Sequence, residues 1–225
     1  KPTDDRAQMQ FGNHPYYGTS LMVTAEEARK VKSAHPEAED FLCEAYGSNE
    51  LIKNLPRACF WIKDQDADLA KTIPPISKAM DRVRAARLNA TNDKAAQKLA
   101  QKPWRFRDQA EAKEHTIVVP RVSSYNRDYL PCGIISATSI VTSEAFALYD
   151  ASLWNLAILS SRMHIQWIAT VCGKFGPSYR YSNTLGWNTF PLPNLTEKNK
   201  EDLTRCAKDI LLAREAHFPA TIADL

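Results

Sequence analysis

The segment 121–129, Arg-Val-Ser-Ser-Tyr-Asn-Arg-Asp-Tyr, concentrates side chains that can hydrogen-bond to the edges of nucleobases. Arginine pairs bidentately with guanine, asparagine pairs bidentately with adenine, and serine can bond to either base. The candidate base-contacting residues are Ser124, Tyr125, Asn126, Arg127 and Tyr129. Arg121 and Ser123 are expected to support the fold instead. The same composition is also compatible with a polar hairpin in which Arg121 makes a structural ion pair.

A strongly basic stretch precedes this segment. Between Lys78 and Arg107 the chain has nine Lys or Arg residues and only two acidic ones, although its overall net charge is only +3. Such a one-sided run suits contacts with DNA phosphates, and the alternative is a solvated helix surface. The candidate phosphate contacts are Arg82, Arg84, Arg87, Lys94, Lys98, Lys102, Arg105, Arg107 and, further along the chain, Arg180. Residues 24–68, with ten acidic and six basic residues, offer phosphates no attraction.

The spacing of apolar residues predicts the elements that would position these side chains. Ile76, Met80 and Val83 keep helical spacing, so one or two helices should carry the basic residues. Strands are expected at 57–62, at 115–119, and at 134–135, 140–141 and 145–148 as further strands of one sheet. Helices are expected from a capping box at Thr24 to about residue 33, over 37–46, and from Thr196 to His217.

The stretch 156–193 is predicted to form the centre of the C-terminal region. Leu156, Leu159, Met163, Trp167 and Val171 recur at helical spacing, which indicates one buried helix. The sequence Lys-Phe-Gly-Pro at 174–177 should end it, because glycine permits positive φ and proline cannot continue the hydrogen-bond ladder. The segments 178–182 and 187–193 are expected to be ordered loops rich in aromatic residues.

The residues that most enzymes need are missing. No glycine-rich loop follows a strand to hold a nucleotide or S-adenosylmethionine, and no Asn-Pro-Pro-aromatic motif is present. The five histidines lack metal-ligand spacing, and His164 is expected to be a packed, hydrogen-bonded side chain. The five cysteines form no C-x-x-C pair, which favours reduced thiols in the cytoplasm. We therefore expect no cofactor site, no metal site and no catalytic residue in this chain, and no run of apolar residues is long enough to suggest a membrane partner.

Several motifs occur together in an order that is specific. They are Phe-Gly-Asn-His-Pro-Tyr-Tyr-Gly at 11–18, Pro-Trp-Arg-Phe at 103–106, Val-Pro-Arg-Val-Ser-Ser at 119–124, Ser-Arg-Met-His with Trp at 161–167, Ser-Tyr-Arg-Tyr-Ser at 178–182, and Trp-Asn-Thr-Phe-Pro-Leu-Pro at 187–193. This series resembles the MmeI-like class of restriction–modification DNA methyltransferases. The sequence departs from that family at Thr189, where asparagine is usual, and at Leu192, where tryptophan is usual.

The resemblance extends from Phe11 to Leu225 and implies a fold, a domain division and a function. It implies an α+β fold with a small mixed sheet flanked by helices, a DNA target recognition domain at 1–148 and a helical C-terminal region at 149–225. The chain is then expected to be part of a longer protein that methylates the exocyclic amine of adenine with S-adenosylmethionine, with or without a fused endonuclease. Its expected partners are double-stranded DNA and an N-terminal methyltransferase domain. The competing hypothesis is a helical scaffold that docks the methyltransferase domain or a partner subunit without reading bases.

Overall fold

The computed structural model describes residues 4–225 and contains three small β-sheets. The central sheet has the strand order β1–β9–β5–β7, and all of its neighbouring strands are antiparallel. Its strands are Gln10–Phe11 (β1), His115–Pro120 (β5), Gly133–Ser136 (β7) and Ala145–Tyr149 (β9). The β-branched run at 117–119 suits a strand that is covered on both faces, and all three of its side chains are buried. The strands predicted at 115–119 and 145–148 are confirmed.

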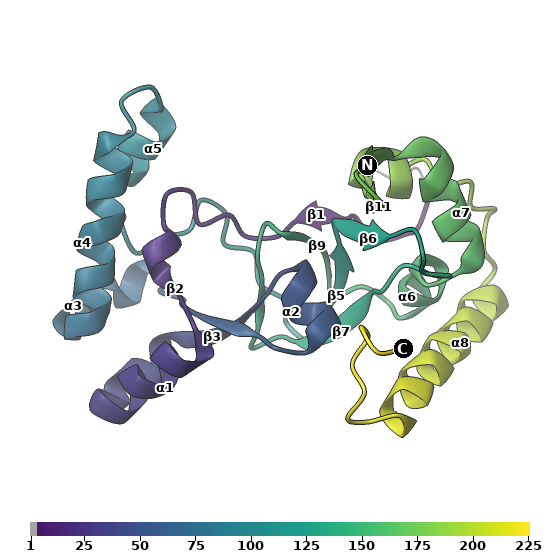
Figure 1. Cartoon of the computed structure of the whole chain (residues 1–225), viewed down its shortest axis with the longest axis horizontal. Helices are drawn as coiled ribbons and strands as arrows, with labels where there is room; N and C mark the ends of the chain where they lie inside the picture. The colour runs from purple at the N-terminus through teal and green to yellow at the C-terminus, as the bar shows by residue number, and fades with distance from the viewer. Residues whose placement is uncertain (1–3) are drawn as a thin grey trace.

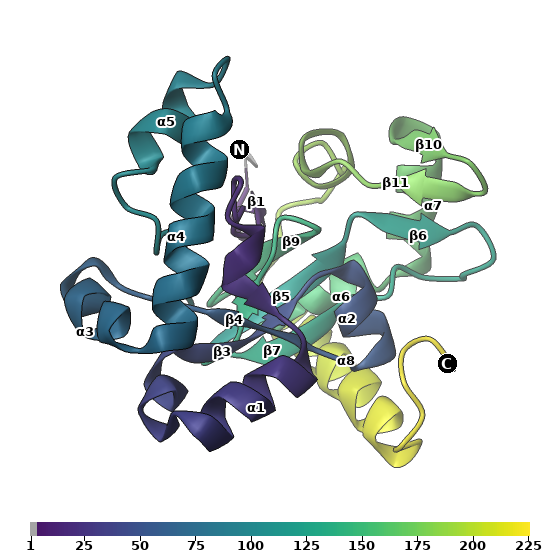
Figure 2. The same ribbon diagram turned by 60° about the vertical axis from the view of Figure 1, so that its left-hand side comes forward.

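The second sheet has the order β2–β4–β3–β8 and belongs to an N-terminal lobe. Its strands are Met22–Val23 (β2), Leu42–Tyr46 (β3), Arg57–Phe60 (β4) and Ile140–Val141 (β8). The helices of this half are Ala25–Ala34 (α1), Ser48–Lys53 (α2), Ala67–Thr72 (α3), Pro74–Asn89 (α4) and Lys94–Leu99 (α5). Figures 1 and 2 show that α3, α4 and α5 stand together at one end of the molecule. The capping box at Thr24 and the strand at 57–60 agree with the prediction.

Two predictions for this half were wrong. Residues 37–46 do not form a helix, because Pro36–Phe41 makes only a 3-10 turn and Leu42–Tyr46 pairs with β4 as a strand. Ile140 and Val141 do not extend the central sheet, because they pair in parallel with Ala45 and Tyr46 in the second sheet. The chain therefore passes from one sheet to the other between residues 136 and 140.

The basic stretch, where one or two helices were predicted, forms the two helices α4 and α5. Two prolines, Pro74 and Pro75, start α4, where their missing N–H groups cost no intrahelical hydrogen bond. Ile76, Met80 and Val83 are buried against the second sheet and its neighbours. Asp93 caps α5 by accepting a hydrogen bond from the Ala96 N–H group at 3.0 Å.

The predicted single helix over 156–171 is two helices. Trp154–Leu159 (α6) ends before Ser160, and Arg162–Val171 (α7) begins after Ser161, whose hydroxyl accepts a hydrogen bond from the His164 N–H group. Ser161 has extended backbone angles and is the N-cap of α7. Met163 is 71% exposed, so the apolar spacing continued across a break in the helix and was misread there.

The loops predicted after this helix contain a β-hairpin. Gly173–Phe175 (β10) pairs with Ser178–Arg180 (β11), and β11 pairs with Val122–Ser124 (β6). Gly176 has a φ of 54°, as its place in a turn before Pro177 requires. We call these three antiparallel strands, β10–β11–β6, the ribbon. A single π-helical turn follows at Asn183–Trp187, and Thr196 caps the long helix Glu197–Ala216 (α8), as predicted.

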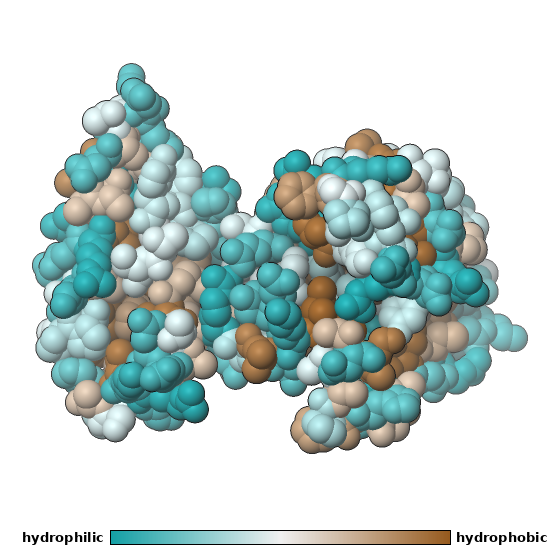
Figure 3. All heavy atoms as spheres, in the orientation of Figure 1, coloured by the Kyte–Doolittle hydropathy of each residue, from teal (hydrophilic) through white to brown (hydrophobic). Residues whose placement is uncertain are grey.

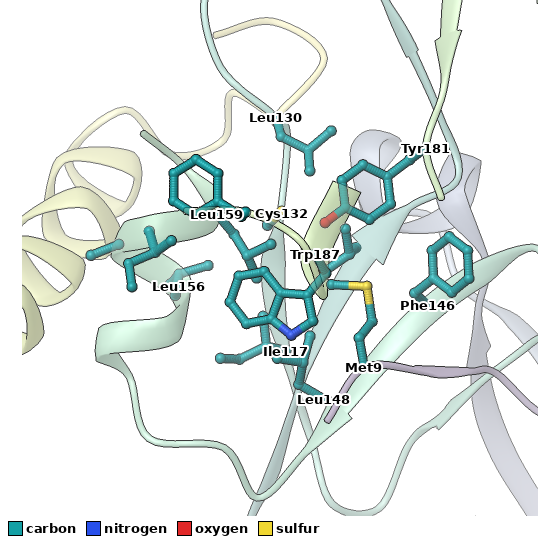
Figure 4. Packing of buried hydrophobic residues seen from close by; sticks show 14 of the residues in the cluster. Met9, Ile117, Leu130, Cys132, Phe146, Leu148, Leu156, Leu159, Tyr181 and Trp187 are labelled. Atoms are coloured by element: carbon teal, nitrogen blue, oxygen red, sulfur yellow. The ribbon is translucent and has the colours of Figure 1, made fainter. Parts of the chain in front are cut away.

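The largest core joins the central sheet to the C-terminal helices. Trp187 is fully buried among side chains that come from β5, β9, α6 and the N-terminal segment, including Ile117, Leu148, Leu156 and Met9 (Figure 4). The Trp187 indole N–H donates to the Ala7 carbonyl at 2.7 Å, and Arg6 donates to the carbonyls of Trp187 and Phe190. Residues before and after 148 therefore share one core. Among the described residues, no helix has the length and apolar character needed to cross a membrane.

Candidate nucleic-acid interface

The ribbon presents one exposed face whose composition follows from strand register. Directly paired residues of antiparallel strands point to the same side of a sheet. Ser124 lies opposite Ser178, which lies opposite Phe175. Val122 lies opposite Arg180 in the same way. Four of these side chains are exposed, and Phe175 is 64% exposed. The face therefore combines an aromatic ring, hydroxyl groups and a guanidinium group.

The predicted base-contacting loop begins where the ribbon ends. The Asn126 N–H group donates to the Ser124 hydroxyl at 3.2 Å, so the chain turns tightly after β6. The Tyr125 ring packs against the Tyr179 ring of β11 at a centroid distance of 4.4 Å, and Lys174 lies over it. Ser124 and Asn126 are exposed, whereas Tyr125 is half-buried. The structure thus brings the loop together with the hairpin of β10 and β11.

The other two candidate base contacts, Arg127 and Tyr129, contact residues near the C-terminal end of the chain. The Arg127 Nη1 atom donates to the Ile222 carbonyl at 3.0 Å. Tyr129 is half-buried and lines a cavity of about 320 Å³ together with Ile210, Arg214 and other residues of α8. These contacts hold this end of the loop against the C-terminal tail and α8.

Arg121 and Ser123 support the fold, as expected. The Arg121 guanidinium lies over the rings of Phe11 and Phe146, and its Nη1 atom donates to the Ser143 carbonyl at 2.8 Å. Ser123 is buried between its exposed neighbours. Within the described residues 4–225, Arg121 makes no ion pair of the kind considered from the composition. It joins the start of β6 to Phe11 of β1 and to the segment 143–146 through two cation–π contacts and the Ser143 carbonyl.

The candidate phosphate contacts on α4 do not form one face. Lys78 and Arg82 are four residues apart and share a side of the helix, whereas Arg84 follows Arg82 by two residues and points away from it. Both arginines are exposed, as are Lys94 and Lys98 on α5. The helix pair is a basic lobe with charges on several sides.

Arg87 does not belong to this exposed set, which corrects its place among the candidate phosphate contacts. Its side chain is completely buried, and its guanidinium donates to five backbone carbonyls at 2.6–3.2 Å. These carbonyls belong to Pro15, Tyr16, Leu99, Lys102 and Arg105. Burial lowers the pKa of Arg87 to about 10, so the group stays protonated at neutral pH. Arg87 is a structural clamp between α4, α5 and the segment at 15–16.

Three further candidates already have acidic partners. Lys102 and Arg105 both pair with Asp64, whose pKa is lowered mainly by hydrogen bonds from Lys102 and Trp104. Arg107 pairs with Asp108 at 3.0 Å and also lies over the Tyr16 ring. Exposed pairs of this kind are weak, so a phosphate can replace the carboxylate. Within residues 4–225, no group of three His, Cys, Asp or Glu side chains is arranged to hold a metal ion.

The basic lobe and the ribbon flank a common hollow. In Figures 1 and 2, α5 and the β10–β11 hairpin rise at opposite ends of the same side of the molecule, and β1 with the segment after it crosses between them. The space-filling view shows a deep notch between the two lobes (Figure 3). We call this notch the saddle.

Comparison with known proteins identifies the family. Residues 1–194 match the family model described as "MmeI, target recognition domain". The chain belongs to this family. It is a target recognition domain of the MmeI type, which confirms the resemblance seen in the sequence. The matched stretch includes β6, the β10–β11 hairpin and both helices of the basic lobe.

Two relatives of this MmeI-type domain extend the comparison. Over 225 residues it is 36% identical to "DNA methyltransferase A" of Bacillus subtilis (strain 168) and covers 25% of that protein. It superposes with a TM-score of 0.92 on the Type IIL restriction-modification enzyme MmeI solved in complex with DNA, at 27% identity over 99% of this chain and 30% of that one. The chain therefore spans a quarter to a third of the length of these relatives.

Sequence reasoning named Arg180 but missed the other residues that the hairpin adds to the candidate site. Phe175, Ser178 and Val122 were not candidates, because 174–177 was interpreted only as the end of a helix. A Gly-Pro turn between Phe175 and Tyr179 is also the pattern of a hairpin with aromatic strands, and that signal was available. The pairing of β11 with β6, across more than fifty residues, had no local signal.

Proposed function

We propose that this target recognition domain reads duplex DNA with the exposed face of the ribbon and the loop that follows β6. The observation that carries the proposal is the register that places Ser124, Ser178 and Phe175 side by side, with Arg180 beside Val122, next to Asn126. A β-ribbon fits the major groove, where each base pair presents a distinct pattern of donors and acceptors. The MmeI enzyme that this chain resembles was solved with DNA.

The base contacts divide within the predicted loop. Ser124 is the last residue of the ribbon, and Tyr125 and Asn126 follow it directly, so we assign all three to base contacts together with Arg180. Arg127 has one guanidinium nitrogen on the Ile222 carbonyl, and Tyr129 packs near α8, so we assign both to holding the loop. Arg82, Arg84, Lys94 and Lys98 would contact phosphates from the basic lobe, and Lys102, Arg105 and Arg107 would do so after exchanging their carboxylate partners.

The chemistry belongs to the rest of the parent protein. We infer that the parent is an S-adenosylmethionine-dependent methyltransferase acting on the exocyclic amine of adenine, with an N-terminal catalytic domain. The relative named DNA methyltransferase A supports this inference. A methyltransferase that flips its target base needs the duplex to be held on both sides, and this domain would hold the second side. Such a protein would work on genomic DNA in the cytoplasm. We also propose that this chain divides at residue 148 into a recognition domain and a helical C-terminal region, and that the parent exists with or without a fused endonuclease.

The test is the methylated sequence motif in cells that express the full-length parent. A bidentate base contact discriminates by about 1–3 kcal/mol, whereas phosphate contacts carry no sequence information. Asn126→Ala or Arg180→Ala should relax the motif at one position and leave the other positions intact. Lys98→Ala, the matched control on the basic lobe, should slow methylation equally at all sites. An unchanged motif in both the Asn126 and Arg180 variants would refute the ribbon as the reading face.

A further inference from the structure

The turn at residues 15–18, Pro-Tyr-Tyr-Gly, holds two consecutive tyrosines in an unfavourable backbone conformation. Tyr16 and Tyr17 have φ values of 51° and 61°, in the left-handed region that bulky side chains rarely adopt. Glycine or asparagine would adopt these angles at lower cost. We call this segment the tyrosine turn. Two bulky side chains at positions where glycine would fit better point to a role for the rings themselves.

The surrounding structure fixes the tyrosine turn from several directions. The buried Arg87 guanidinium donates to the Pro15 and Tyr16 carbonyls, each at 3.0 Å. The Tyr16 N–H group donates to His14 Nδ1 at 2.8 Å, and the Tyr16 hydroxyl donates to Asp93 at 2.6–2.7 Å. Asp93 also caps α5, so the turn is joined directly to the helix that carries Lys94 and Lys98. The Tyr16 ring is therefore held in place before any ligand binds, and the Tyr17 ring packs against it.

The exposed side of the turn is aromatic and basic. Tyr17 is 46% exposed, and its ring lies 5.4 Å from that of Tyr16. Arg107 lies over the Tyr16 ring at 5.2 Å and is itself exposed. The pKa of His14 is lowered by burial first and then by the charge of Arg107; Asp108 opposes this effect and Arg121 adds to it, so arginine and aspartate side chains both lie near this site. Arg121, which directly precedes β6, lies over the ring of Phe11, four residues before the turn.

The tyrosine turn lies where it could contact a DNA duplex bound in the saddle. The segment between β1 and β2, coloured purple in Figure 1, runs beside α4 on the side of the molecule that carries the saddle. A duplex with the ribbon in its groove and α5 beside its phosphates would lie over this segment. Exposed aromatic rings interleaved with arginine and lysine are the pattern with which proteins stack on bases while neutralising the backbone.

We propose that the tyrosine turn is a second DNA contact, in which the Tyr17 ring stacks on a nucleobase and Arg107 contacts the adjacent phosphate. The inference rests on the proposed function, because it needs a duplex in the saddle. It adds a contact that neither the ribbon nor the basic helices supply. The stacked base lies at a base-pair step whose two pairs have separated, because a tyrosine ring reaches the face of a base only when the base stack is interrupted.

The experiment compares Tyr17→Gly and Tyr17→Phe in the full-length parent, with Leu212→Ala on the exposed side of α8 as the control. Binding is measured by fluorescence with duplexes that contain the methylated motif and 2-aminopurine at successive positions. Stacking on one base contributes enough for loss of the ring to weaken binding roughly 5- to 150-fold. Tyr17→Gly should therefore weaken binding in this range and abolish the 2-aminopurine signal at one position. Tyr17→Phe keeps the ring and should keep both, and Leu212→Ala should change neither.

Thermal unfolding separates a binding role from a structural one. Glycine relieves the backbone strain at position 17, so Tyr17→Gly should melt at the same temperature as the wild type or higher. A large drop in melting temperature with a parallel loss of binding would overturn the proposal, because the ring would then be structural. Unchanged binding by Tyr17→Gly would overturn it as well. If Asn126→Ala still relaxes the motif in that case, the proposed function stands without this contact.

Discussion

The Nε2 atom of His164 lies 3.0 Å from the Tyr181 hydroxyl oxygen, and both side chains are buried in the largest core. His164 comes from α7 and Tyr181 directly follows the ribbon, so this hydrogen bond joins the helix to the strand that carries Arg180. The His164 ring also packs edge-on against Phe190 at 4.8 Å and Trp187 at 5.9 Å. Burial, followed by the charge of Arg6, lowers the pKa of His164 to about 3. The imidazole is therefore neutral in the folded protein.

This pKa predicts that the protein loses stability as the pH is lowered from 6.5 to 5, which is above the range in which most carboxylates titrate. Below pH 6.5 the unfolded chain protonates this histidine, whereas the folded protein does not until about pH 3. The free energy of unfolding should therefore decrease by up to about 1.4 kcal/mol per pH unit as pH falls from 6.5 to 5. Urea unfolding at several pH values measures this slope. His164→Gln should flatten it, and His217→Gln, at an exposed position, should not. Equal slopes in all three proteins would contradict the assignment.

Replacing Arg87 should affect folding before it affects DNA binding. Arg87→Ala removes the donor from five backbone carbonyls and should cost at least about 3 kcal/mol of stability. Arg87→Lys should restore little, because an ammonium group has three donors and lacks the planar geometry of guanidinium. Lys98→Ala should leave stability unchanged and lower the salt dependence of DNA binding by about 0.9 in the log–log slope. Denaturant melts and salt titrations give both results. A stable Arg87→Ala protein with a reduced salt slope would return Arg87 to the phosphate contacts.

Gly12 allows β1 to approach the chain around Thr142 closely. A Cβ atom at this position would lie 2.2 Å from the Thr142 carbonyl oxygen, a distance that cannot be accommodated without moving the backbone. Asn13 bridges to Thr142 and donates to the Val141 carbonyl at 2.7 Å, so the segment has little room to shift. Gly12→Ala should destabilise the protein by about 2–3 kcal/mol. Gly173→Ala is the matched control, because its Cβ would meet no atom within 4 Å. Similar melting temperatures for the two variants would show that β1 can move.

The sequence predicted those elements whose signals are local. Thr24 and Thr196 mark helix starts through hydrogen bonds made within three residues, and both capping boxes are present. The β-branched run at 117–119 and the apolar spacing at 76–83 also depend only on neighbours. The family motifs added the fold class and the target recognition function, which periodicity alone does not provide.

What the sequence could not show depends on contacts between distant residues. Arg87 looks like its basic neighbours in the sequence, because the Pro15 and Tyr16 carbonyls that bury it lie more than seventy residues earlier. The break at Ser160 was hidden because an exposed Met163 kept the apolar spacing. The ribbon needs β6 and β11 to meet, so Phe175 could be placed beside Ser124 only once the fold was known.

The two aromatic residues of the β10–β11 hairpin should respond differently to replacement, because they lie on opposite faces of the ribbon. Phe175 is on the exposed face, whereas Tyr179 packs against Tyr125 on the other. Phe175→Ala should leave the melting temperature unchanged and weaken binding to the methylated motif. Tyr179→Ala should cost about 1–2 kcal/mol of stability, because it removes the aromatic contact with Tyr125 and the apolar area buried by the ring. Calorimetric melts and titrations with duplex DNA measure the two effects. If Phe175→Ala binds the motif with wild-type affinity, the exposed face of the hairpin does not contact DNA, and base contacts are confined to the loop at 124–126.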